Sequence, residues 1–104
     1  MPRVAFRMRV FKGKELEYKR RHDELWPELA GLLKEAGIKD YSIFLDESTG
    51  VLFGYLIADD PARLDDLPHA PVMRRWWSYM KDIMETHDDE SPVSHPLKEV
   101  FYLP

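Results

Sequence analysis

A phenol and an imidazole stand four residues apart near the start of the chain. Tyr18 and His22 lie in the stretch YKRRHDELWPE, residues 18–28, and side chains with this spacing share one face of a helix. An imidazole both donates and accepts protons near neutral pH, so this face suits general acid–base chemistry. The alternative is an ordinary histidine on an amphipathic helix, and the residue pattern alone favours that alternative.

Aromatic residues form a second group of interest. Trp76 and Trp77 follow two arginines, and Tyr41 lies in an alternating, strand-like segment. The apolar C–H face of a pyranose sugar packs against such rings, and an indole N–H donates to a hydroxyl group. The alternative is core packing for the tryptophans and cross-strand packing for Tyr41. Composition alone favours this alternative as well.

Several other kinds of chemistry are excluded by the residues present. The chain has no cysteine, which rules out disulfides, thiolate nucleophiles and Cys-ligated metals. Its four histidines do not stand at metal-ligand spacing, so no metal site is predicted. The sequence also has no glycine-rich phosphate loop and no GxSxG motif.

Length and charge place further bounds on the protein. The 104 residues are expected to form one domain, residues 1–104. A net charge of −4 argues against a nucleic-acid partner, which usually requires a concentrated basic excess. The N-terminus has no apolar core typical of a signal peptide, and no apolar run approaches the ~18 residues of a membrane span. We therefore expect a cytoplasmic protein with no membrane partner.

The first third of the chain predicts a strand followed by an interrupted helix. Residues 3–10 alternate between polar and apolar, as in a half-buried strand. Residues 14–36 have helical periodicity, but Pro27 removes a backbone donor, so we expect a break near 22–26 and a new helix beginning with that proline. Gly37 is expected to end the second helix.

The remaining chain predicts three more strands and one main helix. Strands are expected at 38–46 and 51–58, joined by a hairpin loop at 47–50. A helix is expected at 72–84, and a short terminal strand at 98–103. The resulting order, β-α-β-β-α-β, is typical of a ferredoxin-like α+β sandwich with two helices on one face of an antiparallel sheet.

The other face of such a sheet would have no cover within the chain. The expected strands carry apolar residues on both sides, which favours two sheets packing face to face in a dimer. A small polar cavity between the layers would suit a ligand. Gly54 inside the strand 51–58 indicates a bulge or the close approach of another group.

Four blocks of sequence resemble the L-rhamnose mutarotase family, and the resemblance covers the whole chain. The blocks are YKRRHDELWPEL (18–29), YSIFLD (41–46), RRWWSYMKDIM (74–84) and SPVSHPLKEVFYLP (91–104). The resemblance implies a ferredoxin-like fold of the dimeric α/β-barrel type. It also implies an isomerase that interconverts the α and β anomers of L-rhamnose without a cofactor or metal.

The resemblance also implies roles for individual residues. His22 would be the proton donor, and the substrate would be bound by Tyr18, Tyr41, Trp76 and Trp77. The implied chemistry suits a histidine, because ring opening delivers a proton to the ring oxygen and removes one from the anomeric hydroxyl. The group that removes this second proton remains open among Tyr18, Tyr41, a nearby acid and water.

Two other functions remain as alternatives at this stage. One is a sugar-binding or sensing module of the same fold without catalysis. The other is a cofactor-free oxygenase or haem-handling protein, which only the analogy of fold supports. A related 6-deoxysugar or similar aldose as the substrate also remains open.

Overall fold

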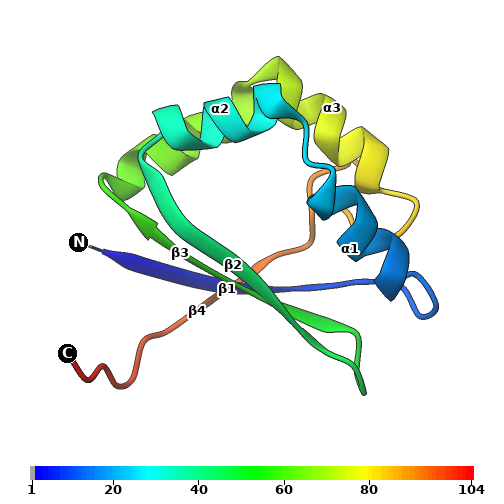
Figure 1. The fold of residues 1–104 in the computed structure, drawn as a ribbon, viewed down its shortest axis with the longest axis horizontal. Coiled ribbons are helices and arrows are strands. Elements are labelled where there is room, and N and C mark those ends of the chain that lie inside the picture. Colours follow the sequence, from blue (N-terminus) through cyan, green and yellow to red (C-terminus); the bar gives the residue numbers. More distant parts are fainter. Residues whose placement is uncertain (1) are drawn as a thin grey trace.

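One antiparallel sheet and a layer of helices make up the computed structural model, which describes residues 2–104 (Figure 1). The elements in chain order are β1 (Arg3–Arg9), α1 (Glu15–Asp23), α2 (Pro27–Glu35), β2 (Ile38–Asp46), β3 (Val51–Ala58), the 3₁₀ helix η1 (Pro61–His69), α3 (Pro71–Met80) and β4 (His95–Leu97). The strand order is β2-β3-β1-β4, and each neighbouring pair is antiparallel. This arrangement confirms the predicted ferredoxin-like α+β sandwich.

The predicted helix break is present at the expected place. α1 ends at Asp23, and Pro27 occupies the first turn of α2, where a missing N–H costs no helical hydrogen bond. Between the two helices the Leu25 N–H donates to the His22 carbonyl oxygen at 3.1 Å. His22 therefore lies in the last turn of α1, and Trp26 lies directly before α2.

The central hairpin has the bounds that the sequence predicted. The Asp46 carbonyl oxygen accepts hydrogen bonds from the N–H groups of Thr49 and Gly50, which closes the loop between β2 and β3. Gly54 lies opposite Phe6 on β1, and a Cβ at Gly54 would come within 2.4 Å of the phenyl ring. The close approach expected at this glycine is thus confirmed, and it leaves room for the far end of the Phe6 ring against β3.

The prediction of a terminal strand at 98–103 was wrong. The last strand is β4, three residues long, and the chain beyond it has no regular structure. The side chains of Val100 and Phe101 are 88% and 78% exposed, so their strand-forming character has no layer to pack against. Arg3 instead holds this segment, because its guanidinium bonds the Glu99 carboxylate and lies 3.5 Å from the centre of the Tyr102 ring.

The helix predicted at 72–84 is real but shorter at its end. α3 stops at Met80, and turns carry the chain onward. Ile83 and Met84 are nevertheless buried. The Ile83 carbonyl oxygen accepts from the Phe11 N–H at 2.9 Å, and Met84 forms a single β-bridge with Val10. Ile83 and Met84 continue the helical spacing of apolar residues and are buried in the core, but they lie beyond the end of the helix.

The helices cover one face of the sheet and leave the other open (Figure 1). No helix among residues 2–104 is long and apolar enough to cross a membrane. The main core lies between the two layers and continues into a cavity. Its most buried members are Val10, Leu29, Leu52, Met80 and Ile83.

Candidate active site

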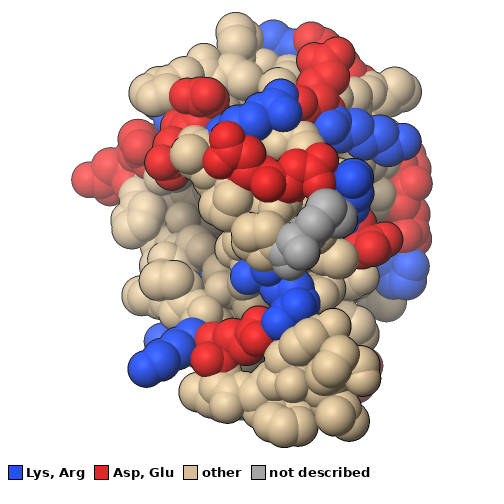
Figure 2. Space-filling view, turned by 90° about the vertical axis from the view of Figure 1, so that its left-hand side faces the viewer, with Lys and Arg blue, Asp and Glu red and all other residues tan. Residues whose placement is uncertain are grey.

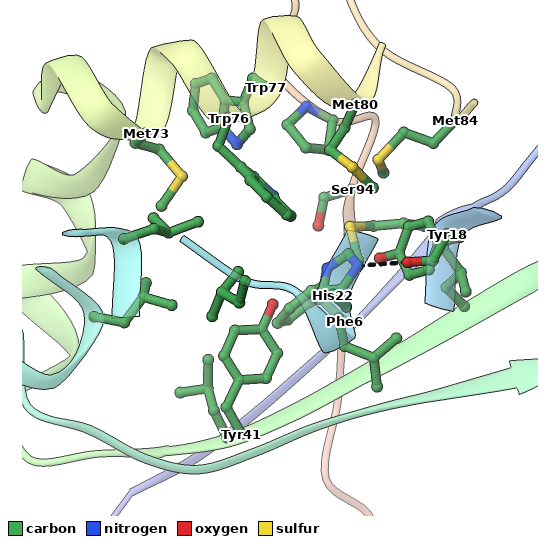
Figure 3. A pocket seen from close by; sticks show the side chains of 18 of the residues that line it. Phe6, Tyr18, His22, Tyr41, Met73, Trp76, Trp77, Met80, Met84 and Ser94 are labelled. Carbon is green, nitrogen blue, oxygen red and sulfur yellow. Dashed lines mark hydrogen bonds between the residues drawn. The ribbon is translucent and has the colours of Figure 1, made fainter. Parts of the chain in front are cut away.

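A cavity of about 1220 Å³ lies between the helices and the covered face of the sheet. Side chains from β1, α1, β2, α3 and the segment after α3 converge on it (Figure 3). Most of its wall is apolar, and its polar groups are few. The residues labelled in the figure are Phe6, Tyr18, His22, Tyr41, Met73, Trp76, Trp77, Met80, Met84 and Ser94.

His22 is held in one orientation by the backbone of its own helix. Its Nδ1 lies 3.0 Å from the Tyr18 carbonyl oxygen (Figure 3). A carbonyl oxygen only accepts hydrogen bonds, so Nδ1 carries the proton and Nε2 is the nitrogen left for a ligand. The spacing of four residues that marked this pair in the sequence thus sets the tautomer of the imidazole as well as its direction.

Two aromatic rings fix the plane of the imidazole. The Tyr18 ring stacks on His22 with ring centres 4.3 Å apart. Trp76 meets His22 edge to face at 5.3 Å, and Trp26 meets Trp76 in the same way at 5.1 Å. Trp76 is only 7% exposed, so this aromatic group is part of the packed core and keeps His22 from rotating freely.

Tyr41 reaches the cavity from the sheet. Its ring meets Phe6 edge to face at 6.2 Å, and its hydroxyl points into the cavity beneath Trp76 (Figure 3). Trp77 also lines the cavity, and the Arg74 guanidinium lies 5.5 Å from the centre of the Trp77 ring. Phenol and indole groups therefore approach the cavity from opposite layers.

Burial changes the acidity of His22, Tyr18 and Tyr41. It lowers the pKa of His22 below its ordinary value, because an apolar surrounding disfavours the charged ring; the Tyr18 carbonyl and Asp23 oppose this only in part. Burial raises the pKa of Tyr41 to about 12. It also raises the pKa of Tyr18, and the phenol of Tyr41 adds to that rise. Both phenols are therefore hydrogen-bond donors at neutral pH.

All five residues singled out in the sequence line this cavity. Tyr18, His22 and Trp76 are in direct contact, whereas Tyr41 faces them from the sheet and Trp77 lies further along α3. Their roles in catalysis and binding stay predictions. The cavity has further members that sequence reasoning missed, namely Phe6, Met73, Met80, Met84 and Ser94. It also missed Trp26, which does not line the cavity but packs against Trp76.

Different signals were available for these missed residues. The ring of Trp26 packs behind Trp76, and its place within the stretch 18–28 pointed to this neighbourhood. Ser94 comes from an irregular segment whose residues show no periodicity, so no sequence signal placed it near His22. Among residues 2–104, no group of three or more His, Asp or Glu side chains is arranged to hold a metal ion.

The fold is shared with solved structures. The sandwich, with its cavity between the layers, is a ferredoxin-like domain of the dimeric α/β-barrel type. A structure of a Mycobacterium tuberculosis protein matches 98% of this chain and 97% of its own with a TM-score of 0.62. Its sequence identity is only 12%, so this likeness concerns the fold alone.

Closer matches identify the family. The family model of L-rhamnose mutarotase matches residues 3–103. An L-rhamnose mutarotase of Rhizobium meliloti is 57% identical over 103 residues, covering 99% of both chains. A crystal structure of an L-rhamnose mutarotase from Formosa agariphila matches all of both chains with a TM-score of 0.94 and 46% identity. The chain belongs to the L-rhamnose mutarotase family, which confirms the resemblance noted in the sequence.

Proposed function

We propose that this protein interconverts the α and β anomers of L-rhamnose, with His22 as the proton donor to the ring oxygen. The observation that carries the proposal is the imidazole itself, held at Nδ1 by the Tyr18 carbonyl and free at Nε2 inside a cavity. The matching relatives are named L-rhamnose mutarotases, and the reaction needs only positioned proton transfer.

The reaction breaks one bond of the sugar ring and forms it again. Ring opening breaks the bond between the anomeric carbon and the ring oxygen, which gains a proton. The anomeric hydroxyl loses its proton and becomes the aldehyde oxygen. Rotation of the aldehyde and closure of the ring by the reverse steps give the other anomer. Each positioned proton transfer contributes roughly 10²–10⁴ in rate.

The acidity of the cavity groups favours His22 as the source of the donated proton. Tyr18 and Tyr41 keep their protons at neutral pH because burial raises the pKa of each phenol, so both are poor bases. His22 is largely neutral, because burial lowers its pKa. We therefore propose that Nε2 accepts the anomeric proton and passes a proton to the ring oxygen, which is bonded to the same carbon.

The remaining cavity residues suit the shape of the sugar. The hydroxyls of Tyr18 and Tyr41 would donate to sugar oxygens, and Trp76 and Trp77 would pack against its C–H face. L-Rhamnose carries a methyl group at C5, and the largely apolar wall around Met73 suits that group. A hydroxymethyl sugar would bring an additional hydroxyl to this wall and lose its hydration there.

We also propose that the protein acts as a homodimer through the open face of the sheet. Phe44 on β2 and Phe53 on β3 are directly opposite each other, and Phe44 is 66% exposed. From one side of the molecule, Figure 2 shows charges of both signs over most of the surface and an uncharged area at its lower end. A second copy would cover the two phenylalanines of the open face. A cytoplasmic location stays a prediction from the sequence.

The activity is tested by measuring the rate of anomer exchange with saturation-transfer NMR. Wild-type protein is expected to accelerate exchange of L-rhamnose more than that of L-fucose, D-ribose or D-glucose. His22→Ala is expected to lose the acceleration while its circular dichroism spectrum stays unchanged. His69→Ala is the matched control, because His69 is exposed on η1 and does not line the cavity.

Two results would contradict the proposal. Full acceleration in His22→Ala would exclude this residue as the proton donor. Binding of L-rhamnose by the wild type without any faster exchange would instead favour a sugar-sensing module. These outcomes are separable, because binding is read from saturation-transfer difference signals and exchange from the anomeric resonances.

A further inference from the structure

β2 contains one residue more than regular pairing with β3 would use. The register with β3 is regular up to Lys39 and from Ser42 onward, but it shifts between these two residues. Asp40 and Tyr41 therefore both stand opposite Leu56. Two residues opposing one make a β-bulge, a feature that often re-aims a side chain beside an active site.

The bulge decides which face of the sheet Tyr41 occupies. Lys39 pairs with Ile57, so a regular ladder continuing from this pair would set Tyr41 opposite Tyr55. Tyr55 lies between Gly54 and Leu56 in β3 and so faces away from the helices, because successive strand residues point to opposite faces. The shift of one residue turns Tyr41 to the covered face instead, where it lines the cavity.

Asp40 supplies the backbone conformation that the bulge needs. Its φ angle is +51°, in the left-handed region that glycine, asparagine and aspartate enter most readily. The first residue of one common bulge type adopts this conformation and is usually glycine. Residues held in such a conformation are concentrated at functional sites, and here the next residue along the chain is Tyr41.

We propose that Asp40 is a positioning residue, whose left-handed backbone forms the bulge that directs the Tyr41 side chain into the cavity. This inference rests on the proposed function only for the consequence that Tyr41 then meets the sugar. The backbone conformation of Asp40 is what matters, so residues that tolerate positive φ would replace it. A β-branched residue, which strongly disfavours that region, would not.

The experiment compares Asp40→Asn, Asp40→Gly, Asp40→Ala and Asp40→Val. The first readout needs no sugar: a nuclear Overhauser effect between the rings of Phe6 and Tyr41, whose centres are 6.2 Å apart. The second is the KM and kcat of L-rhamnose exchange. The Asn and Gly variants are expected to keep the ring contact and the kinetic constants of the wild type. Val is expected to lose the ring contact and raise KM about three- to tenfold, as for one lost hydrogen bond.

Ser42→Val is the matched control. It places the same β-branched side chain two residues away, in the regular and exposed part of β2, where valine suits the strand. It is expected to keep the ring contact and the KM. Circular dichroism checks the fold of each variant, and Asp40→Ala, which strains the left-handed region less, replaces Val if the Val protein does not fold.

Each outcome decides something different. A ring contact in Asp40→Val as strong as in the wild type would overturn the proposal. Equal losses of the contact in the Asn, Gly and Val variants would also overturn it, because the carboxylate would then be the essential group. Loss of the contact without a change in KM would support the positioning role and contradict sugar binding by Tyr41. Absence of exchange in the wild type would contradict the proposed function, and the ring contact would still test Asp40.

Discussion

At the scale of single residues, the Tyr18 carbonyl has two effects on His22. It holds the proton on Nδ1, which leaves Nε2 for the proton transfer proposed above, and it favours the charged ring. Burial outweighs the second effect, so the pKa of His22 lies below its ordinary value. A histidine that is neutral at pH 7 begins the reaction as a proton acceptor and becomes a donor only after receiving a proton.

This assignment predicts how exchange depends on pH. The rate is expected to be level above the lowered pKa of His22 and to fall as pH drops through it, because protonated Nε2 no longer accepts the anomeric proton. Exchange rates measured by NMR between pH ~4.5 and ~8.5 (about two units either side of the ordinary histidine pKa) would show this decline at low pH. A rate that instead rises toward low pH would mean that the charged ring is the resting form.

The free energy of unfolding should depend on pH through the same group, His22. The unfolded chain binds the His22 proton at its ordinary pKa, about 6.5, whereas the folded chain binds it only at lower pH. Stability from this group is therefore complete above 6.5 and is lost as pH falls toward the lowered value. Urea unfolding of His22→Gln should lack this loss. Carboxylates with lowered pKa, such as Asp82, lose their contribution only at more acidic pH.

Residue spacing predicted part of the site and missed the rest for physical reasons. The pair Tyr18 and His22 could be found because a helix converts a spacing of four into contact. Tyr41 stood out as an aromatic residue in a strand-like segment, but only the family resemblance assigned it to the site, since its place opposite β3 depends on a bulge. A single Asp in a strand-like segment does not reveal that its φ is positive, and so the role proposed for Asp40 required the structure.

At the scale of elements, α1 depends on one arginine. Tyr18 is its only buried residue. The Arg21 side chain is 10% exposed and donates to Glu17 within α1, to the Tyr79 carbonyl oxygen at 2.6 Å and to Asp82 at 2.9 Å. These bonds join the helix that carries His22 to the end of the helix that carries Trp76.

We therefore predict that Arg21→Ala destabilises the fold by about 1.5–3 kcal/mol, the range for hydrogen bonds to charged groups. Arg21→Lys should recover little, because an ammonium group cannot make the forked contact with Asp82. Urea unfolding measures both. Arg20→Ala is the control, since Arg20 is exposed and forms its salt bridges with Glu17 and Glu24 of the same segment; equal losses at the two arginines would contradict the prediction.

The elements themselves were predictable where one local signal dominated. Pro27 fixed the break between α1 and α2, and alternation gave β2 and β3 their bounds. The segment 98–103 has equally strong strand-forming residues, yet it forms no strand. Strand formation there requires a neighbouring strand and a layer to cover it, and neither is visible in the local sequence.

At the scale of the whole molecule, the open face of the sheet predicts association. Phe44→Glu would place a charge within the proposed interface and is expected to convert a dimer into monomers, as measured by light scattering after size exclusion. Ala62→Glu on η1, exposed and away from the sheet, is the control. A wild-type monomer, or a Phe44→Glu dimer of unchanged mass, would contradict an interface through this face.

The close approach at Gly54 separates two properties of the site. The missing methyl group there leaves room for the Phe6 ring, which lies edge to face with Tyr41, while the imidazole proposed to transfer protons is held on another layer by α1. Changes at the glycine and phenylalanine would reshape the floor of the cavity without touching the imidazole. Substrate range and reaction chemistry in this fold are therefore open to separate selection, and an engineer seeking a different sugar would begin with these two residues.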